Sequence, residues 1–106
     1  MSKKTAAAKP SLADMQAHAC EASSLLKAMG NEQRLLILCL LADGELNVGA
    51  LQSQIGLSQS ALSQHLAILR DADFVLTRKA AQAVFYSLSE GPVKQVMQTL
   101  HKIYCE

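Results

Sequence analysis

Two periodicities alternate along the chain, one helical and one extended. Apolar residues recur every three or four positions through residues 12–71 and again at the C-terminal end, which is the spacing of amphipathic helices. Between these regions, two stretches rich in β-branched and aromatic residues indicate strands. We therefore expect the order ααααββα, with helices over 12–29, 32–42 and 48–55, a fourth that begins at residue 59 and includes residue 70, a fifth over 90–106, and strands over 75–79 and 84–88.

Residues that commonly cap helices stand at the ends of these segments. A serine or asparagine side chain accepts hydrogen bonds from the free N–H groups of a first helical turn, and glycine tolerates the left-handed conformation that ends many helices. The expected N-caps are Ser11, Asn31, Asn47, Ser58 and Ser89, and the expected stops are Gly30, Asp43-Gly44 and Gly56. Residues 80–83 join the two predicted strands, so we place them in the hairpin loop. This loop contains no Asn-Gly or Asp-Gly pair, the usual signal of a tight hairpin turn.

The third and fourth helices are separated by a turn of three residues, 56–58, which is the spacing of a helix-turn-helix. In the fourth helix Leu62, Leu66 and Leu69 recur at helical spacing and should face inward, while the opposite face is small and polar. The hairpin that follows has the position of a wing. The fold class predicted is therefore mainly α with a β-hairpin, a winged helix-turn-helix.

The polar face of the fourth helix suits a DNA major groove, which admits an α-helix with short polar side chains. Glutamine can read adenine edges, serine can contact bases or phosphates, and arginine or lysine can anchor phosphates. The alternative is a solvated amphipathic helix beside an exposed hairpin. The residues that we predict to contact DNA are Ser58, Gln59, Ser60, Ser63, Gln64, His65, Arg70, Arg78, Lys79 and Gln82.

Length and composition add limits to this prediction. A chain of 106 residues suits one domain, which we place at 11–106 behind a mobile basic tail over 1–10. A net charge of +1 hardly favours nucleic-acid binding, so the position of the charges carries that argument. No apolar run reaches the roughly 20 residues of a membrane span, so we expect a cytoplasmic protein without membrane contact. No catalytic arrangement is legible, and neither an enzyme nor a cofactor is expected.

The same segments resemble a known family. The stretches "LKAMGNEQRLLILCLL" (26–41) and "LSQSALSQHLAILRDADFVLTRKAAQAVFYSLS" (57–89) are similar to the second helix, recognition helix and wing of ArsR/SmtB-type repressors. The resemblance extends over about residues 14–105. It implies a two-fold homodimer built by the first and last helices, whose recognition helices enter successive major grooves of an inverted-repeat operator.

Many members of this family sense metals, but the residues of their two main sites are missing here. The arsenic-type site needs two cysteines at the start of the third helix, where this chain has Asn47 and Gly49. Aligning the zinc-type pattern on His101 places Leu88, Glu90 and Tyr104 at the other ligand positions, which leaves one histidine. We expect no metal site. A metal-responsive regulator with an unrecognised site and a protein-interaction module on the same scaffold stay open as alternatives.

Two of the three cysteines match the family's redox- and persulfide-sensing subgroup, which includes regulators of haemolysin and of biofilm growth. Cys39 lies in the second helix and Cys105 at the end of the last, with 65 residues between them. The resemblance implies that oxidation or persulfidation of this dithiol by an oxidant or a reactive sulfur species releases DNA. The alternative for Cys39 is a small core residue. His101, one turn before Cys105, is either a partner of that thiol or an ordinary surface histidine, and Cys20 is expected to be structural.

Overall fold

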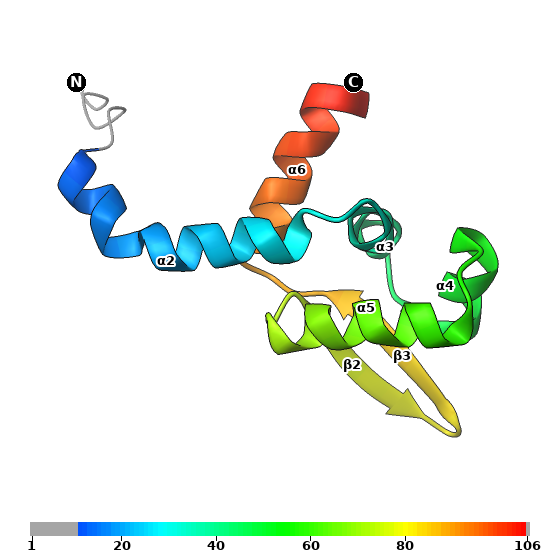
Figure 1. Ribbon diagram of the computed structural model, residues 1–106. Helices are drawn as coiled ribbons and strands as arrows, with labels where there is room; N and C mark the ends of the chain where they lie inside the picture. The colour runs from blue at the N-terminus through cyan, green and yellow to red at the C-terminus, as the bar shows by residue number, and fades with distance from the viewer. Residues whose placement is uncertain (1–10, 106) are drawn as a thin grey trace.

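The structure, a computed structural model, describes residues 11–105 (Figure 1). Within that range five helices and three short strands follow one another, and the helices and the hairpin come in the predicted order ααααββα. The elements are α2 (Leu12–Met29), α3 (Glu32–Ala42), β1 (Leu46–Asn47), α4 (Val48–Ile55), α5 (Gln59–Asp71), β2 (Val75–Ala80), β3 (Ala83–Leu88) and α6 (Pro92–Cys105). The predicted tail over 1–10 and the last residue of the predicted domain lie outside the described residues.

Four of the five predicted N-caps are confirmed, because each side chain accepts a hydrogen bond from the backbone N–H three residues further on. The pairs are Ser11 with Asp14, Asn31 with Arg34, Asn47 with Ala50 and Ser58 with Ala61, at 2.8–3.1 Å. Gly56 ends α4 with a φ of 80°, a left-handed conformation that glycine adopts without strain. The turn between α4 and α5 is therefore encoded locally.

The fifth predicted cap is wrong. Ser89 is only 7% exposed, and its hydroxyl has no hydrogen-bond partner within the described part of the chain. Its backbone N–H donates to the carbonyl oxygen of Phe74 at 2.9 Å, which prolongs the strand pairing beyond the end of β3. The helix α6 starts later, at Pro92, and the carbonyl oxygen of Gly91 accepts from the N–H of Lys94 at 3.1 Å. Tertiary pairing thus outweighs the local capping preference.

The predicted four-residue hairpin loop is also wrong. Strands β2 and β3 pair as far as Ala80 and Ala83, so the turn consists of Ala81 and Gln82 alone, and Ala81 has a φ of 57°. The sequence analysis also missed β1, whose Leu46 pairs antiparallel with Tyr86 and which makes the sheet order β1-β3-β2. The wing is therefore the hairpin β2–β3, and its strand β3 also pairs with β1, which leads directly into α4.

The core forms around α3, which packs against α2, α4, α5, α6 and β3. The three predicted inward leucines of α5 are fully or almost fully buried, which confirms the prediction for that face. The core residues are Met29, Ile37, Leu38, Leu41, Leu51, Leu62, Leu66, Leu69, Phe74, Val75, Tyr86 and Val93. The sequence of α3 is apolar on nearly all sides, which predicts a fully buried helix, but this prediction is wrong because Leu36 is 47% exposed and Cys39 is also exposed.

The recognition elements and the terminal helices lie at opposite ends of the molecule. Figure 1 shows the β2–β3 hairpin projecting beside α5 at one end, while α6 and the N-terminal half of α2 extend away from it at the other. The apolar stripe predicted for α2 consists of Met15, Ala19, Ala22, Leu26 and Met29. Of these only Met29 is buried, and Met15 and Leu26 face solvent in the single chain. No helix within residues 11–105 is long and apolar enough to span a membrane.

Candidate DNA-binding surface and dithiol groove

The face of α5 opposite the leucines presents the predicted reading side chains to solvent. Amphipathicity orients this helix, because burying one leucine stripe leaves the other side exposed. Exposed residues on or next to this helix are Ser58, Gln59, Ser60, Ser63, Gln64 and Arg70. The structure therefore brings most of the predicted α5 contacts to one helix with an open surface, at the end of the molecule where the wing also lies (Figure 1).

His65 differs from its neighbours on α5. It is half-buried, and its Nδ1 lies 3.4 Å from Nη1 of Arg34 in α3. An arginine can only donate, so a neutral His65 accepts at Nδ1 and carries its proton on Nε2. The same guanidinium donates from Nε to the carbonyl oxygen of Ala28 at 2.6 Å, and so satisfies a free carbonyl at the end of α2. His65 is thus engaged with the core side of the helix.

The three predicted residues of the wing also have different surroundings. Lys79 and Gln82 are exposed at and beside the hairpin turn. Arg78 instead forms two hydrogen bonds with Glu45, from Nε to Oε2 at 3.0 Å and from Nη2 to Oε1 at 2.7 Å. The side-chain hydrogen bond from Arg78 lowers the pKa of Glu45 from its usual value. Sequence reasoning missed Glu45, because 33 residues separate the two partners and no local spacing connects them.

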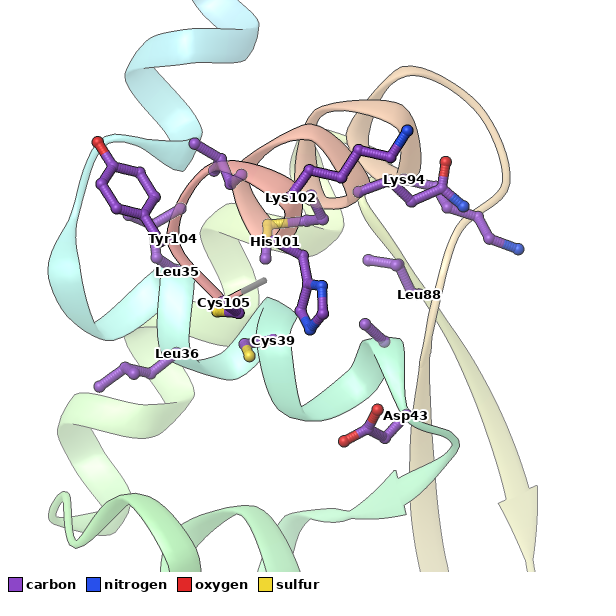
Figure 2. A pocket seen from close by; sticks show the side chains of 14 residues that line it. Leu35, Leu36, Cys39, Asp43, Leu88, Lys94, His101, Lys102, Tyr104 and Cys105 are labelled. Atoms are coloured by element: carbon purple, nitrogen blue, oxygen red, sulfur yellow. The ribbon is translucent and has the colours of Figure 1, made fainter.

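The predicted cysteine pair lies on one groove between α3 and α6. Cys39 and Cys105 are free, exposed thiols, and both line this groove, whose volume is about 900 Å³ (Figure 2). The alternative that Cys39 is a core residue is therefore wrong, since its side of α3 faces the groove. We call this site the dithiol groove. Its lining residues are Leu35, Leu36, Cys39, Ala42, Asp43, Leu88, Lys94, Met97, Gln98, Leu100, His101, Lys102, Tyr104 and Cys105.

The surroundings of the two thiols are apolar with basic groups at the edge. His101 and Lys102 come from α6, as Cys105 does, and Figure 2 shows the imidazole of His101 projecting toward α3. Cys20 is exposed on α2 and does not line the groove. Within residues 11–105 no three histidine, cysteine, aspartate or glutamate side chains are grouped closely enough to hold a metal ion. An exposed thiol is accessible to oxidants in solution.

The fold and the exposed face of α5 define a winged helix-turn-helix regulator, and the comparisons with known proteins identify its family. Residues 31–77 match the family of bacterial regulatory proteins called the arsR family. Transcriptional activator HlyU of Vibrio cholerae serotype O1 is 56% identical over 90% of this chain and 88% of its own length. The biofilm growth-associated repressor of Xylella fastidiosa is 40% identical over 87% of this chain and 81% of its own length.

Solved structures of the same two relatives agree with the fold. A structure described as reduced HlyU from Vibrio cholerae matches with a TM-score of 0.84 over 90% of this chain and all of that chain, at 56% identity. The transcriptional repressor BigR from Xylella fastidiosa matches with a TM-score of 0.83 and 38% identity, over 92% of this chain and 99% of that chain. The protein belongs to the arsR family and is a DNA-binding transcriptional regulator.

Proposed function

We propose that this protein is a homodimeric regulator whose affinity for an inverted-repeat operator falls when the Cys39–Cys105 dithiol is oxidised or persulfidated. The observation that carries the proposal is the dithiol groove, in which two thiols with 65 residues between them are both exposed and line one surface. The proposed site of action is the cytoplasm, where a reducing environment keeps resting thiols reduced.

DNA recognition is assigned to α5 and the wing. The exposed serines and glutamines of α5 enter the major groove and read base edges, while Arg70 and Lys79 neutralise phosphates. Gln82 lies at the turn of the wing, where it can reach the backbone of the duplex. Operator occupancy can lower or raise transcription, and the relatives include proteins named as repressors and one named as an activator. We assign this chain the role of repressor or anti-repressor.

Dimerisation is assigned to α2 and α6. Large apolar side chains are exposed on both helices of the single chain, among them Leu26 on α2 and Ile103 on α6, each about 60% exposed. Exposed apolar side chains on neighbouring elements are typical of a surface that another chain covers. A two-fold axis beside these helices would place two copies of α5 on one side of the dimer, as an inverted repeat requires.

The thiol chemistry takes two steps and needs an external oxidant. With hydrogen peroxide, one thiolate attacks the O–O bond and becomes a sulfenic acid, and the second thiolate attacks that sulfur and expels hydroxide as the disulfide forms. With a polysulfide, one thiolate attacks an inner sulfur atom, expels a shorter polysulfide and keeps a hydropolysulfide, Cys–S–S–SH. The second thiolate then attacks the middle sulfur of that chain, and hydrosulfide leaves as a trisulfide bridge forms. In each case the oxidant takes up two electrons. A reduced form of the relative HlyU has a solved structure, in keeping with a thiol form of this chain as the starting point.

A covalent link across the dithiol groove would join α3, which packs against the proposed recognition helix α5, to α6, which is assigned to the dimer interface. The helix α3 packs against both α5 and α6. Pulling α3 and α6 together would therefore change the separation of the two recognition helices in the dimer, which a fixed operator spacing does not tolerate.

Titration of an operator duplex with reduced and with polysulfide-treated protein tests this proposal. Treatment should weaken binding by the wild type about 5- to 150-fold, while Cys39→Ser and Cys105→Ser keep the affinity of the reduced protein. Cys20→Ser is the matched control, because this exposed thiol lies outside the groove, and it should respond like the wild type. Loss of binding on treatment of Cys39→Ser would contradict the proposed dithiol mechanism.

Two other outcomes point to the alternatives. Weaker operator binding on addition of zinc to a variant without thiols would indicate a metal-responsive regulator. Absence of salt-dependent binding to any duplex, including the promoter of its own operon, would indicate a protein-interaction module.

A further inference from the structure

Arg78 spans the outer face of the three-stranded sheet. It belongs to β2, and its direct cross-strand partner is Phe85 of the central strand β3. Phe85 in turn pairs with Asn47 of β1 on the far side. Because directly paired residues point to the same face of a sheet, Arg78 and Phe85 share one face. The neighbouring Tyr86 points to the other face and is buried in the core.

The guanidinium of Arg78 is held on that face from two directions. Its central carbon lies 4.8 Å from the centroid of the Phe85 ring, within cation–π range. Its Nε and Nη2 donate in parallel to the two carboxylate oxygens of Glu45, which immediately precedes β1. A bidentate pair fixes direction as well as distance. We call Glu45, Arg78 and Phe85 the wing clasp.

The wing clasp connects the hairpin to the helix-turn-helix. Strand β1 leads directly into α4, so Glu45 is anchored three residues before the first helix of that unit. Strand β1 pairs with β3 over only two residues, so the outer part of the hairpin is two-stranded, and a two-stranded hairpin by itself is only marginally stable. We propose that Glu45 and Arg78 are positioning residues for DNA binding, which hold the wing at a set angle to α5, and that Arg78 is not a phosphate contact. This inference rests on the proposed role of the wing at the operator.

The charges of the wing support this division of roles. Glu45 already pairs with Arg78 within the clasp, so a phosphate would have to compete with this carboxylate for the guanidinium. Lys79, the next residue, is exposed, and no ion pair within residues 11–105 includes it. The phosphate contact of the wing is therefore assigned to Lys79.

Operator titrations at several salt concentrations separate a positioning role from a phosphate contact. Glu45→Ala and Arg78→Gln should each weaken binding about fivefold, the lower end of typical coupling between sites. The double variant should be no weaker than either single variant, since both break one clasp. The slope of log affinity against log salt should stay that of the wild type. Lys79→Gln should reduce its magnitude by about 0.9 for each protomer.

Controls keep this test independent of folding and of the thiol proposal. Glu90→Ala removes another exposed ion pair, with Lys94 on α6, and should leave operator affinity unchanged. Amide hydrogen exchange over residues 76–87 should accelerate in the two clasp variants while melting temperatures stay close to the wild type, which a merely stabilising pair would not produce. The measurements use reduced protein throughout, so the outcome does not depend on the dithiol.

A smaller salt slope for Arg78→Gln together with tighter binding by Glu45→Ala would overturn the inference, because it would show Arg78 on a phosphate. Affinities equal to the wild type in both clasp variants would overturn it as well. A wild type that binds no duplex would instead remove the proposed function. Arg78→Lys, which keeps the charge and loses the parallel pair, should fall between the wild type and Arg78→Gln.

Discussion

Arg34 of α3 reaches His65 of the recognition helix, with its Nη1 3.4 Å from the imidazole Nδ1. From the same guanidinium, Nε donates to Ala28 and Nη2 to Lys27, both at the carbonyl end of α2. One half-buried cation therefore connects the helix assigned to the dimer with the helix assigned to DNA. Hydrogen bonds from a charged donor contribute more to stability than neutral ones. The carbonyl oxygen of Lys27 also accepts from the N–H of Gly30 at 3.3 Å, so the bond to Ala28 matters most.

Replacement of Arg34 by Met should destabilise the fold. The variant leaves the carbonyl group of Ala28 and the Nδ1 of His65 without their donor, and we expect the free energy of unfolding to fall by about 1–3 kcal/mol. Urea denaturation of the reduced protein measures this change. His65→Asn keeps the contacts to α2 and serves as the control with a smaller loss. Equal stability of Arg34→Met and the wild type would refute the assigned role.

Replacement of Gln64 by Ala should relax base readout. Gln64 is exposed on the reading face, and a glutamine that pairs with an adenine edge provides about 1–3 kcal/mol of discrimination. The affinity ratio between the operator and variants substituted at each adenine should shrink at one position, with an unchanged salt slope. Gln95→Ala, at an exposed position on α6, is the control. Unchanged ratios at every adenine would exclude Gln64 from readout.

A charge at the apolar ends of α2 or α6 should break the proposed dimer. Leu26→Asp and Ile103→Asp place a carboxylate where another chain would bury it, and the dimer dissociation constant should rise at least about tenfold. Sedimentation velocity at several concentrations measures it. Leu76→Asp is the matched control, because Leu76 is 58% exposed on β2, away from both helices. Dimers of wild-type strength in both helix variants would place the interface elsewhere.

Acid should open the wing clasp. Because the hydrogen bond from Arg78 lowers the pKa of Glu45 from its usual value, their pairing is complete above the unfolded-state pKa of glutamate and is lost as pH falls through the lower folded-state pKa. Hydrogen exchange over residues 76–87, corrected for intrinsic rates, should be independent of pH between 5 and 8 for this contact and should accelerate only at a pH below the usual glutamate pKa of about 4.3. Glu45→Ala should lack the acid step. An identical step in that variant would assign it to another carboxyl group.

The mass of the treated protein should reveal which product forms in the dithiol groove. A direct disulfide is two hydrogens lighter than the reduced chain, and it requires Cα atoms about 4.4–6.8 Å apart. A sulfur bridge adds the mass of its inserted atoms and spans a wider gap. We expect polysulfide to give an added mass on a peptide pair containing Cys39 and Cys105, with Cys20 unlinked. A product linking Cys20 would contradict the assigned pair.

Local sequence determined most elements of this protein. Helical period, capping side chains and the glycine of the turn act over three or four residues, and the hydrogen bonds of Ser11, Asn31, Asn47 and Ser58 all close over a separation of three. The leucine stripe of α5 likewise fixed which face is buried and which can read DNA. The two local errors, the cap at Ser89 and the length of the hairpin turn, arose where strand pairing overrode local preference.

Tertiary structure decided which distant residues meet. The resemblance to a known family identified Cys39 and Cys105 as a candidate dithiol, but only the packing of α3 against α6 places both thiols on one groove. The third strand, which no periodicity in the sequence predicted, brings Glu45 to Arg78. The physical reason is the same in both cases. In each pair the two residues belong to segments more than thirty residues apart. Their relative position depends on how whole elements pack rather than on spacing along the chain.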